Sequence, residues 1–356
     1  MALSKVETNM IDGTVSAITK STNDPTPSSN LSAGTIWANT NSGEMYICTD
    51  ATTNANVWTN IGDGTGVIQT FTPTTATGGT VTTSGDYKIH TFTSSGNFVV
   101  TSAGQTVEVL VVAGGGSGGA YYGGGGGAGG LIHKATHTVT TSTYPVVIGA
   151  GGAGTSSTGK GNTGNDSTVS TGGSAIFTAK GGGLGQVTHG DDGTGGSGGG
   201  SGHRGGNPNS NQVGGPAIQT SQPGDSGTYG FGYAGGLGYG NPHYNTGGGG
   251  GAGGVGQDAT TTESGDGGLG KDFSTNFGTG VGDSGWFASG GGGGATTDGS
   301  TVPGHVTSGG GTEGASSNTT TAAAAANTGG GSGGGYNQGL TGAGGSGVVI
   351  FKYKFQ

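Results

Sequence analysis

Charged residues are scarce in this sequence, and those present are mostly acidic. Only 8% of the 356 residues are charged, the formal net charge is −9, and Arg204 is the single arginine. Nucleic-acid binding depends on basic side chains that neutralise phosphates, and neither an Arg-Gly-Gly repeat nor an aromatic RNA-binding motif is present. We therefore expect no nucleic-acid partner.

Cysteine and long apolar segments are nearly absent as well. Cys48 is the only cysteine, so no disulfide can form within one chain. No apolar run reaches the 18 residues of a membrane span, and the first ten residues lack the apolar region of a secretory signal. These features predict a chain that folds in the cytoplasm and is not inserted into a membrane.

Glycine is what the sequence has in excess. Hydrophobic residues make up only 28% of the chain, which argues against a large conventional core, whereas 94 residues are glycine. Uninterrupted glycine blocks lie at 123–127, 247–251 and 290–294. Because glycine loses the most backbone entropy on folding, such blocks need a repetitive backbone lattice to become ordered.

Polyglycine II helices can supply that lattice. They have three residues per turn, and their outward amides and carbonyls can bond neighbouring helices. Collagen is excluded, since the chain has no strict three-residue period and only nine prolines. A bundle of short polyglycine II helices is predicted instead.

The chain divides into four predicted parts. Residues 1–30 form an amino-terminal attachment segment and linker, and residues 31–62 form a small β module with strands at 34–38, 44–48 and 57–61. Trp37, Tyr46 and Trp58 are its expected core. Residues 63–86 are predicted to be a Thr/Gly spacer, and residues 87–356 the main glycine-rich domain.

The main domain is predicted to be mainly β, with essentially no α-helix. Its sheet strands are expected at about 87–113, with a hairpin turn at 94–97, and at about 131–149, 174–180 and 346–355. Apolar strands at both ends of the glycine-rich region can pair with one another. We therefore expect a β-sheet scaffold that brackets the polyglycine II bundle, with loops at the ends of the bundle.

Those loops carry most of the large side chains between the glycine blocks. Tyrosine interleaved with glycine, serine and asparagine is typical of adaptable binding surfaces. Five aromatic residues between 229 and 244 are expected in one stretch of loop, and the aromatic pair at 286 and 287 is expected to be an exposed anchor. The candidate contact residues are His203, Arg204, Tyr229, Phe231, Tyr233, Tyr239, His243, Tyr244, Trp286 and Phe287.

Motifs for catalysis, metals and cofactors are weak. Matches to G-x-G-x-x-G are expected by chance at this glycine content, and no helix follows them. Residues 253–258 and 267–272 match the start of a calcium-binding repeat, but they lie 14 residues apart rather than nine. Nothing resembles a nucleophile-base-acid set. We expect no enzyme activity, no cofactor and no metal.

In combination, several motifs resemble the glycine-rich tail-fibre and tail-fibre tip adhesins of bacteriophages. The matching segments are Tyr87-Lys-Ile-His-Thr-Phe92, Val107-Glu-Val-Leu-Val-Val-Ala-Gly-Gly115, Val146-Val-Ile-Gly-Ala-Gly-Gly-Ala-Gly154 and Gly344-Gly-Ser-Gly-Val-Val-Ile-Phe-Lys-Tyr353. The stretch from 33 to 62 looks like a separate module found near the start of such fibres. The resemblance implies a polyglycine II sandwich whose loops bind host surface receptors.

The expected function is therefore host attachment by a virion tail fibre. The resemblance implies a host outer-membrane protein or glycan as receptor and other virion tail or baseplate proteins as partners. It leaves a homotrimer open and places the protein in the virion, after assembly in the host cytoplasm. The alternative is a self-associating structural fibre or extracellular filament protein without a receptor. A polysaccharide depolymerase is disfavoured because acidic clefts and long apolar rungs are missing.

Overall fold

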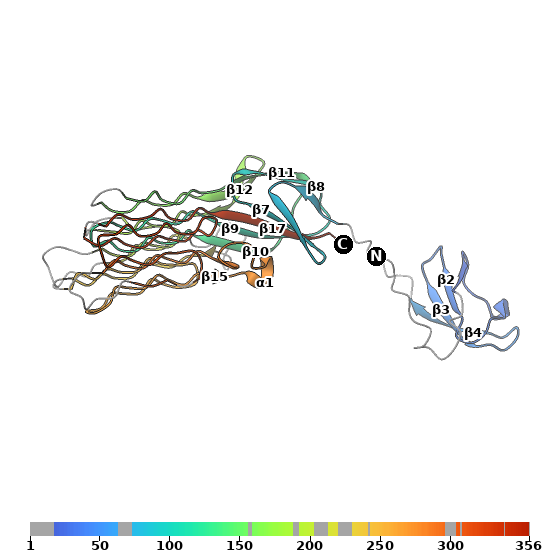
Figure 1. Ribbon diagram of the computed structural model, residues 1–356. Helices are drawn as coiled ribbons and strands as arrows, with labels where there is room; N and C mark the ends of the chain where they lie inside the picture. Colours follow the sequence, from blue (N-terminus) through green and yellow to red (C-terminus); the bar gives the residue numbers. More distant parts are fainter. Residues whose placement is uncertain are drawn as a thin grey trace. The chain divides into compact units, whose positions relative to one another are not determined.

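The computed structural model describes residues 18–62, 73–155, 159–187, 192–202, 213–219, 230–240, 243–295, 304–306, 308–337 and 339–355. The chain splits into two compact units, Met1–Phe71 and Thr72–Gln356. Both are built from β-strands, and the one α-helix of the described residues is the single turn α1 (Ser274–Phe277) (Figure 1). The predicted fold class is confirmed.

The first unit is a four-stranded sheet in the order β1-β2-β3-β4. Its elements are β1 (Thr19–Ser21), the 3-10 turn η2 (Pro27–Ser29), β2 (Ile36–Asn39), β3 (Met45–Asp50) and β4 (Val57–Gly62). The rings of Trp37 and Trp58 meet edge to face, with centroids 5.7 Å apart. β1 falls in the predicted linker, yet it pairs in parallel with β2, so the module begins earlier than the sequence indicates.

The second unit contains two sheets, with strand orders β14-β10-β9-β17-β7-β6 and β13-β12-β11-β8-β5, and the short pair β15-β16. Its strands are β5 (Thr75–Thr77), β6 (Thr80–Ser84), β7 (Tyr87–Phe92), β8 (Gly96–Ser102), β9 (Val107–Val112), β10 (Leu131–His137), β11 (Ser142–Val147), β12 (Ser167–Thr171), β13 (Ser174–Ala179), β14 (Gly230–Phe231), β15 (Lys271–Asp272), β16 (Trp286–Phe287) and β17 (Val348–Lys354).

The last strand closes the fold. β17 lies between β7 and β9 and pairs with both in antiparallel register, so that Val349 is opposite Phe92 on one side and Val111 on the other. Aromatic side chains of the two sheets meet in the core, where the rings of Phe98 and Phe351 stack 4.1 Å apart. The predicted bracketing of the glycine-rich region by its end strands is confirmed.

Two local expectations fail. The hairpin predicted at 94–97 is not formed, because β7 and β8 belong to different sheets and the chain crosses from one to the other between them. Residues 75–84, expected in the spacer, form β5 and β6 instead. These threonine-rich strands lie at one edge of each sheet and are largely exposed, a position that β-branched polar residues such as threonine suit well.

The glycine-rich segments form a hydrogen-bonded lattice that extends from the strands (Figure 1). Segment 123–130, which we call the central helix, shows its rule. Every third amide bonds the same neighbour: amides 123, 126 and 129 donate to segment 329–335, amides 124, 127 and 130 to segment 180–186, and amides 125 and 128 to segment 247–250. Successive amides point to three different neighbours, and the fourth points to the first neighbour again. This is the pattern of a helix with three residues per turn.

Three further neighbours donate to the central helix, from segments 113–119, 197–200 and 291–294. Six hydrogen-bonded neighbours leave no space for side chains along glycines 123–127, and Ala128 is the one larger residue of the segment. A Cβ on Gly125 would lie well inside 3.0 Å of the Gly291 carbonyl, and a Cβ on Gly126 would meet Gly116 in the same way. The glycine content is thus explained by backbone packing on all sides, as the sequence predicts.

Candidate functional site

Tyrosines occupy the turn at the end of the lattice that lies farthest from the strands, which we call the tip. The chain leaves β9, runs through segment 113–120, turns at Tyr121 and Tyr122, and returns along the central helix to β10. Both turn residues have left-handed backbones, with φ of 56° and 54°. A side chain in this conformation costs roughly 1–2 kcal/mol relative to the right-handed one.

Two more tyrosines join them. The ring of Tyr122 lies 5.0 Å from Tyr121, 5.8 Å from Tyr244 and 5.6 Å from Tyr336, measured between centroids. We call these four residues the tyrosine cluster. Tyr336 is buried and Tyr122 and Tyr244 are half-buried, whereas Tyr121 is 42% exposed. The cluster is therefore a packed aromatic base with one ring presented to solvent.

Tyr244 repeats the backbone feature of the turn. It also has a left-handed backbone, with φ of 52°. Glycine adopts this conformation without the side-chain penalty, and the chain has 94 glycines. Three tyrosines stand at positions that suit glycine. Because backbone strain of this kind concentrates at functional sites, we take this as an indication that the aromatic side chains serve a function.

Backbone and hydroxyl contacts hold the cluster on the lattice. The Thr246 hydroxyl donates to the carbonyl of Gly123 at 2.9 Å, directly beside the turn. The amide of Tyr239 donates to the carbonyl of Asn245 at 2.7 Å, and the Asn245 side chain donates to the carbonyl of Thr260 at 2.9 Å. The loop that carries Tyr244 is thereby fixed to the same lattice end as the turn.

Tyr122, at the centre of the cluster, is uncharged at neutral pH. Burial raises the pKa of Tyr122, and the neighbouring hydroxyl of Tyr336 raises it further, with smaller contributions from Tyr121 and Tyr244. A phenol with a raised pKa stays protonated at neutral pH. The exposed part of the cluster therefore offers ring faces together with hydroxyl donors and acceptors.

The structure brings some of the predicted contact residues to this end. Tyr239 and Tyr244 lie here, and His243 lies between them in sequence with its ring 6.1 Å from that of Tyr239. Tyr239 is 40% exposed. The predicted contacts His203, Arg204 and Tyr229 lie outside the described residues.

Other predicted contacts lie elsewhere. Phe231 is in β14, opposite Leu131 of β10, and eight residues of central helix at about 3.1 Å each separate Leu131 from the turn by about 25 Å. Tyr233 is exposed, but Gly235 and Gly236 beyond it bond into the lattice. The single aromatic loop predicted for 229–244 is therefore not formed, because a lattice helix runs through it.

The predicted anchor at 286 and 287 is also corrected. Both residues belong to β16, at the strand end of the lattice. Phe287 is fully buried and packs near Phe273, with ring centroids 6.4 Å apart. Trp286 is half-buried opposite Asp272. Phe287 thus stabilises the core and is not available to a partner.

Sequence reasoning missed Tyr121, Tyr122 and Tyr336. One signal was present for the first two, since a pair of aromatic residues between glycine blocks marks the point where one lattice helix ends and the next begins. No local signal joins them to Tyr336. That contact exists because segment 329–335 pairs with the central helix.

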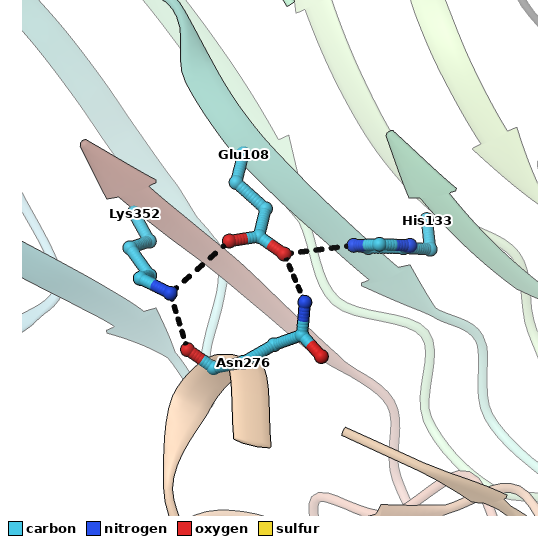
Figure 2. A network of polar contacts seen from close by, with 4 residues as sticks. All are labelled: Glu108, His133, Asn276 and Lys352. Atoms are coloured by element: carbon cyan, nitrogen blue, oxygen red, sulfur yellow. Dashed lines mark hydrogen bonds and ion pairs between the residues drawn. The ribbon is translucent and has the colours of Figure 1, made fainter. Parts of the chain in front are cut away.

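A polar network at the strand end of the unit is the second cluster of interest (Figure 2). One carboxylate oxygen of Glu108 lies 2.9 Å from His133 Nε2 and accepts a 2.5 Å hydrogen bond from Asn276, while the other lies 3.3 Å from Lys352 Nζ. Lys352 also donates to the Asn276 carbonyl at 2.7 Å. The network joins β9, β10 and β17 to α1.

The charge on Glu108 is stabilised by these partners. Burial raises the pKa of Glu108, but the hydrogen bonds from His133 and Asn276 and the positive charge of Lys352 outweigh it, so the pKa lies below its usual value. A cavity of about 330 Å³ borders the network and is lined partly by Glu108, Lys352 and Tyr87. Every oxygen of the carboxylate is already engaged, an arrangement suited to clamping α1 onto the sheet.

Neither cluster contains a metal-ligand set. Within the described residues, no group of three or more His, Cys, Asp or Glu side chains is arranged to hold a metal ion. The same residues contain no helix with the length and apolarity of a membrane span.

A known protein family matches most of the second unit. The model of a glycine-rich domain matches residues 92–354, from the end of β7 to the last residue of β17. The chain belongs to this glycine-rich domain family. The match spans the lattice and the tyrosine cluster of the glycine-rich domain, and it excludes the first unit. Among curated proteins, a search finds no match to the chain.

Proposed function

We propose that this protein is a bacteriophage tail-fibre adhesin that attaches the virion to the host surface through the tyrosine cluster. The observation that carries the proposal is that three tyrosines at the tip have left-handed backbone conformations, which glycine would adopt with less strain. The glycine-rich domain would then act as a rigid support, and the exposed Tyr121 ring would be the centre of the contact. Tyr239 and His243 extend this surface.

The proposed partner is a host receptor, either an outer-membrane protein or a glycan, and other virion tail or baseplate proteins would hold the fibre. Rigid aromatic side chains give contact area at small entropic cost. Several fibres per particle, or a homotrimeric fibre, would convert modest affinity at one tip into firm attachment. The protein would be located in the virion.

Binding of the fluorescently labelled full chain to a panel of candidate host cells tests this function. The test variant is Tyr121→Gly/Tyr122→Gly, which removes two rings at positions where glycine is favoured. Tyr87→Ala is the matched control, because Tyr87 is 40% exposed but lies in β7, at the other end of the domain.

We expect saturable binding to at least one strain, unchanged in Tyr87→Ala and reduced at least tenfold in the double variant. A tenfold loss corresponds to about 1.4 kcal/mol of binding free energy. Equal binding by all three proteins would exclude the tyrosine cluster as the contact. Absence of binding to every strain would count against the adhesin function itself.

A further inference from the structure

Four aspartates accept backbone amides from distant segments of the second unit; the bonds of Asp258 and Asp266 are exposed, and those of Asp166 and Asp283 are part-buried. Each bond joins two segments at least 15 residues apart, and the distances lie between 2.7 and 2.9 Å. The pairs are Asp166 with the amide of Gly181, Asp258 with Leu237, Asp266 with His305, and Asp283 with Gly309. Carboxylates are suited to this position because they accept hydrogen bonds and donate none when ionised.

The geometry of the helices explains why such amides are left over. In segment 230–240, the amide of Gly235 donates to Gly215 and the amide of Gly236 donates to Gly248, which are both lattice neighbours. The next amide, that of Leu237, is turned away from both and donates to Asp258. The Leu237 amide of this segment thus points away from the lattice, where a side chain and not a backbone carbonyl accepts it.

Side chains occupy the same outer surface. Val255 is 60% exposed and Leu269 is 50% exposed, and their amides have no partner in the described part of the chain. Inside the lattice, a Cβ on Gly249 would overlap the carbonyl of Gly126. A glycine helix of another molecule could not approach Val255 or Leu269 as closely as lattice neighbours approach one another.

From these two observations we infer that the lattice is closed to a second copy of the chain. Aspartate carboxylates accept hydrogen bonds from amides that could otherwise donate to the carbonyls of a glycine helix in a second chain. At the remaining outward positions, side chains keep such a helix at a distance. Exposed rows of backbone donors commonly lead to edge-to-edge association in β proteins, and charged residues at edges prevent it. The acidic excess of the sequence has a structural role in this arrangement.

The inference goes beyond the proposed function, since a closed lattice would be a property of the domain whatever its tip binds. It opposes a filament built by lattice pairing between chains. Any oligomer would have to assemble through other surfaces.

An open-edge variant of the full chain tests closure: Val255→Gly, Asp258→Gly, Asp266→Gly and Leu269→Gly combined. In sedimentation velocity we expect the natural chain to keep one sedimentation coefficient as concentration rises and the open-edge variant to shift to larger species. The control is Asp258→Asn/Asp266→Asn, which loses both charges but keeps an acceptor oxygen at each site. It should behave as the natural chain does.

An open-edge variant that is folded by circular dichroism and shows no association would overturn the inference. Association of the asparagine control would show that charge repulsion, not amide capping, keeps the chains apart. If the open-edge variant fails to fold, hydrogen exchange of the natural chain tests amide capping directly. The amides of Leu237 and His305 should exchange more slowly than those of Val255 and Leu269, and equal rates would contradict capping.

Discussion

The His90 ring and the Tyr353 hydroxyl form a buried hydrogen bond of 3.1 Å between two strands that lie 263 residues apart in the chain. The rings stack at 5.5 Å, and His90 Nδ1 lies 2.7 Å from the carbonyl of Gly78. The Tyr353 hydroxyl also accepts the amide of Ala76 at 3.1 Å. Because Nδ1 faces a carbonyl, it carries the proton, and Nε2 accepts the hydroxyl hydrogen of Tyr353.

This arrangement predicts acid sensitivity. Burial lowers the pKa of His90 below its usual 6.5, and nearby Lys88 lowers it further, although the Gly78 carbonyl partly opposes both. The unfolded chain therefore binds a proton more readily than the folded one, so stability falls as pH drops below about 6.5 and continues to fall down to the folded pKa. Thermal unfolding between pH 7 and 5 should show this decrease.

The matched variant is His90→Phe, which keeps an aromatic ring but cannot titrate. It should be less stable at pH 7 by about 1–2 kcal/mol, because two hydrogen bonds are lost. Its stability should change less between pH 7 and 5 than that of the natural chain. An unaltered pH dependence in His90→Phe would assign the sensitivity to another group.

The Glu108 network predicts a second acid transition. The folded pKa of Glu108 is lowered, so its contribution to stability is complete above the ordinary value of 4.5 and is lost as pH falls through the folded pKa. Glu108→Ala should destabilise the domain at pH 7 by about 2–3 kcal/mol, less than for a fully buried pair, because it leaves Lys352 and His133 without their shared partner.

Urea unfolding at pH 7 measures that loss, and Glu108→Gln is the control. Glutamine keeps the shape and an acceptor for His133 but removes the charge that Lys352 contacts. Hydrogen exchange in α1 should accelerate in Glu108→Ala, since Asn276 is released. If α1 exchanges at the natural rate in that variant, the network does not clamp it.

The lattice predicts an uncommon sensitivity to alanine. Gly125→Ala should prevent folding of the glycine-rich domain or cost several kcal/mol, because its Cβ would overlap the Gly291 carbonyl of a neighbouring helix that cannot withdraw. Gly280→Ala is the control, since nothing lies within 4 Å of the Cβ it would add. It should change stability by less than about 1 kcal/mol. Circular dichroism with thermal melting distinguishes the two.

Backbone strain at the tip predicts an order of stabilities for variants of Tyr121. Tyr121→Ala and Tyr121→Gly both remove the ring, but only alanine keeps a Cβ in the left-handed conformation. Glycine should therefore be the more stable of the two by about 1 kcal/mol, the reverse of their order in a helix or strand. Urea unfolding of both variants measures this order. Greater stability of the alanine variant would mean that the turn relaxes once the ring is gone.

The main strands could be predicted because their apolar and β-branched side chains form patterns that are visible in the sequence. The apolar runs that became β7, β9 and β17 are visible in the sequence, and their pairing follows from their positions at the two ends of the glycine-rich region. β12 was missed, since Val169 is its only apolar residue among serines and threonines. Its place in the sheet depends on pairing with β11 and β13.

The tyrosine cluster was less accessible to sequence reasoning. Glycine blocks are locally identical, so nothing in a block specifies which other block it will lie beside. The contacts that join Tyr122 to Tyr244 and Tyr336 are set by the register of the lattice, which involves the whole domain. The polar network has the same origin, because Asn276 reaches Glu108 from 168 residues away.

In the central helix, hydrogen-bond donors rotate through three directions, so the position of a residue within each group of three decides which neighbouring segment its amide faces. Removing one glycine from 123–130 would turn every later donor by a third of a revolution and aim it at the wrong neighbour. Removing three would shorten the helix by one turn, about 9 Å, and leave each remaining donor facing its partner segment. The length of the central helix can therefore change in steps of three residues, and only in such steps does every remaining amide keep its partner segment.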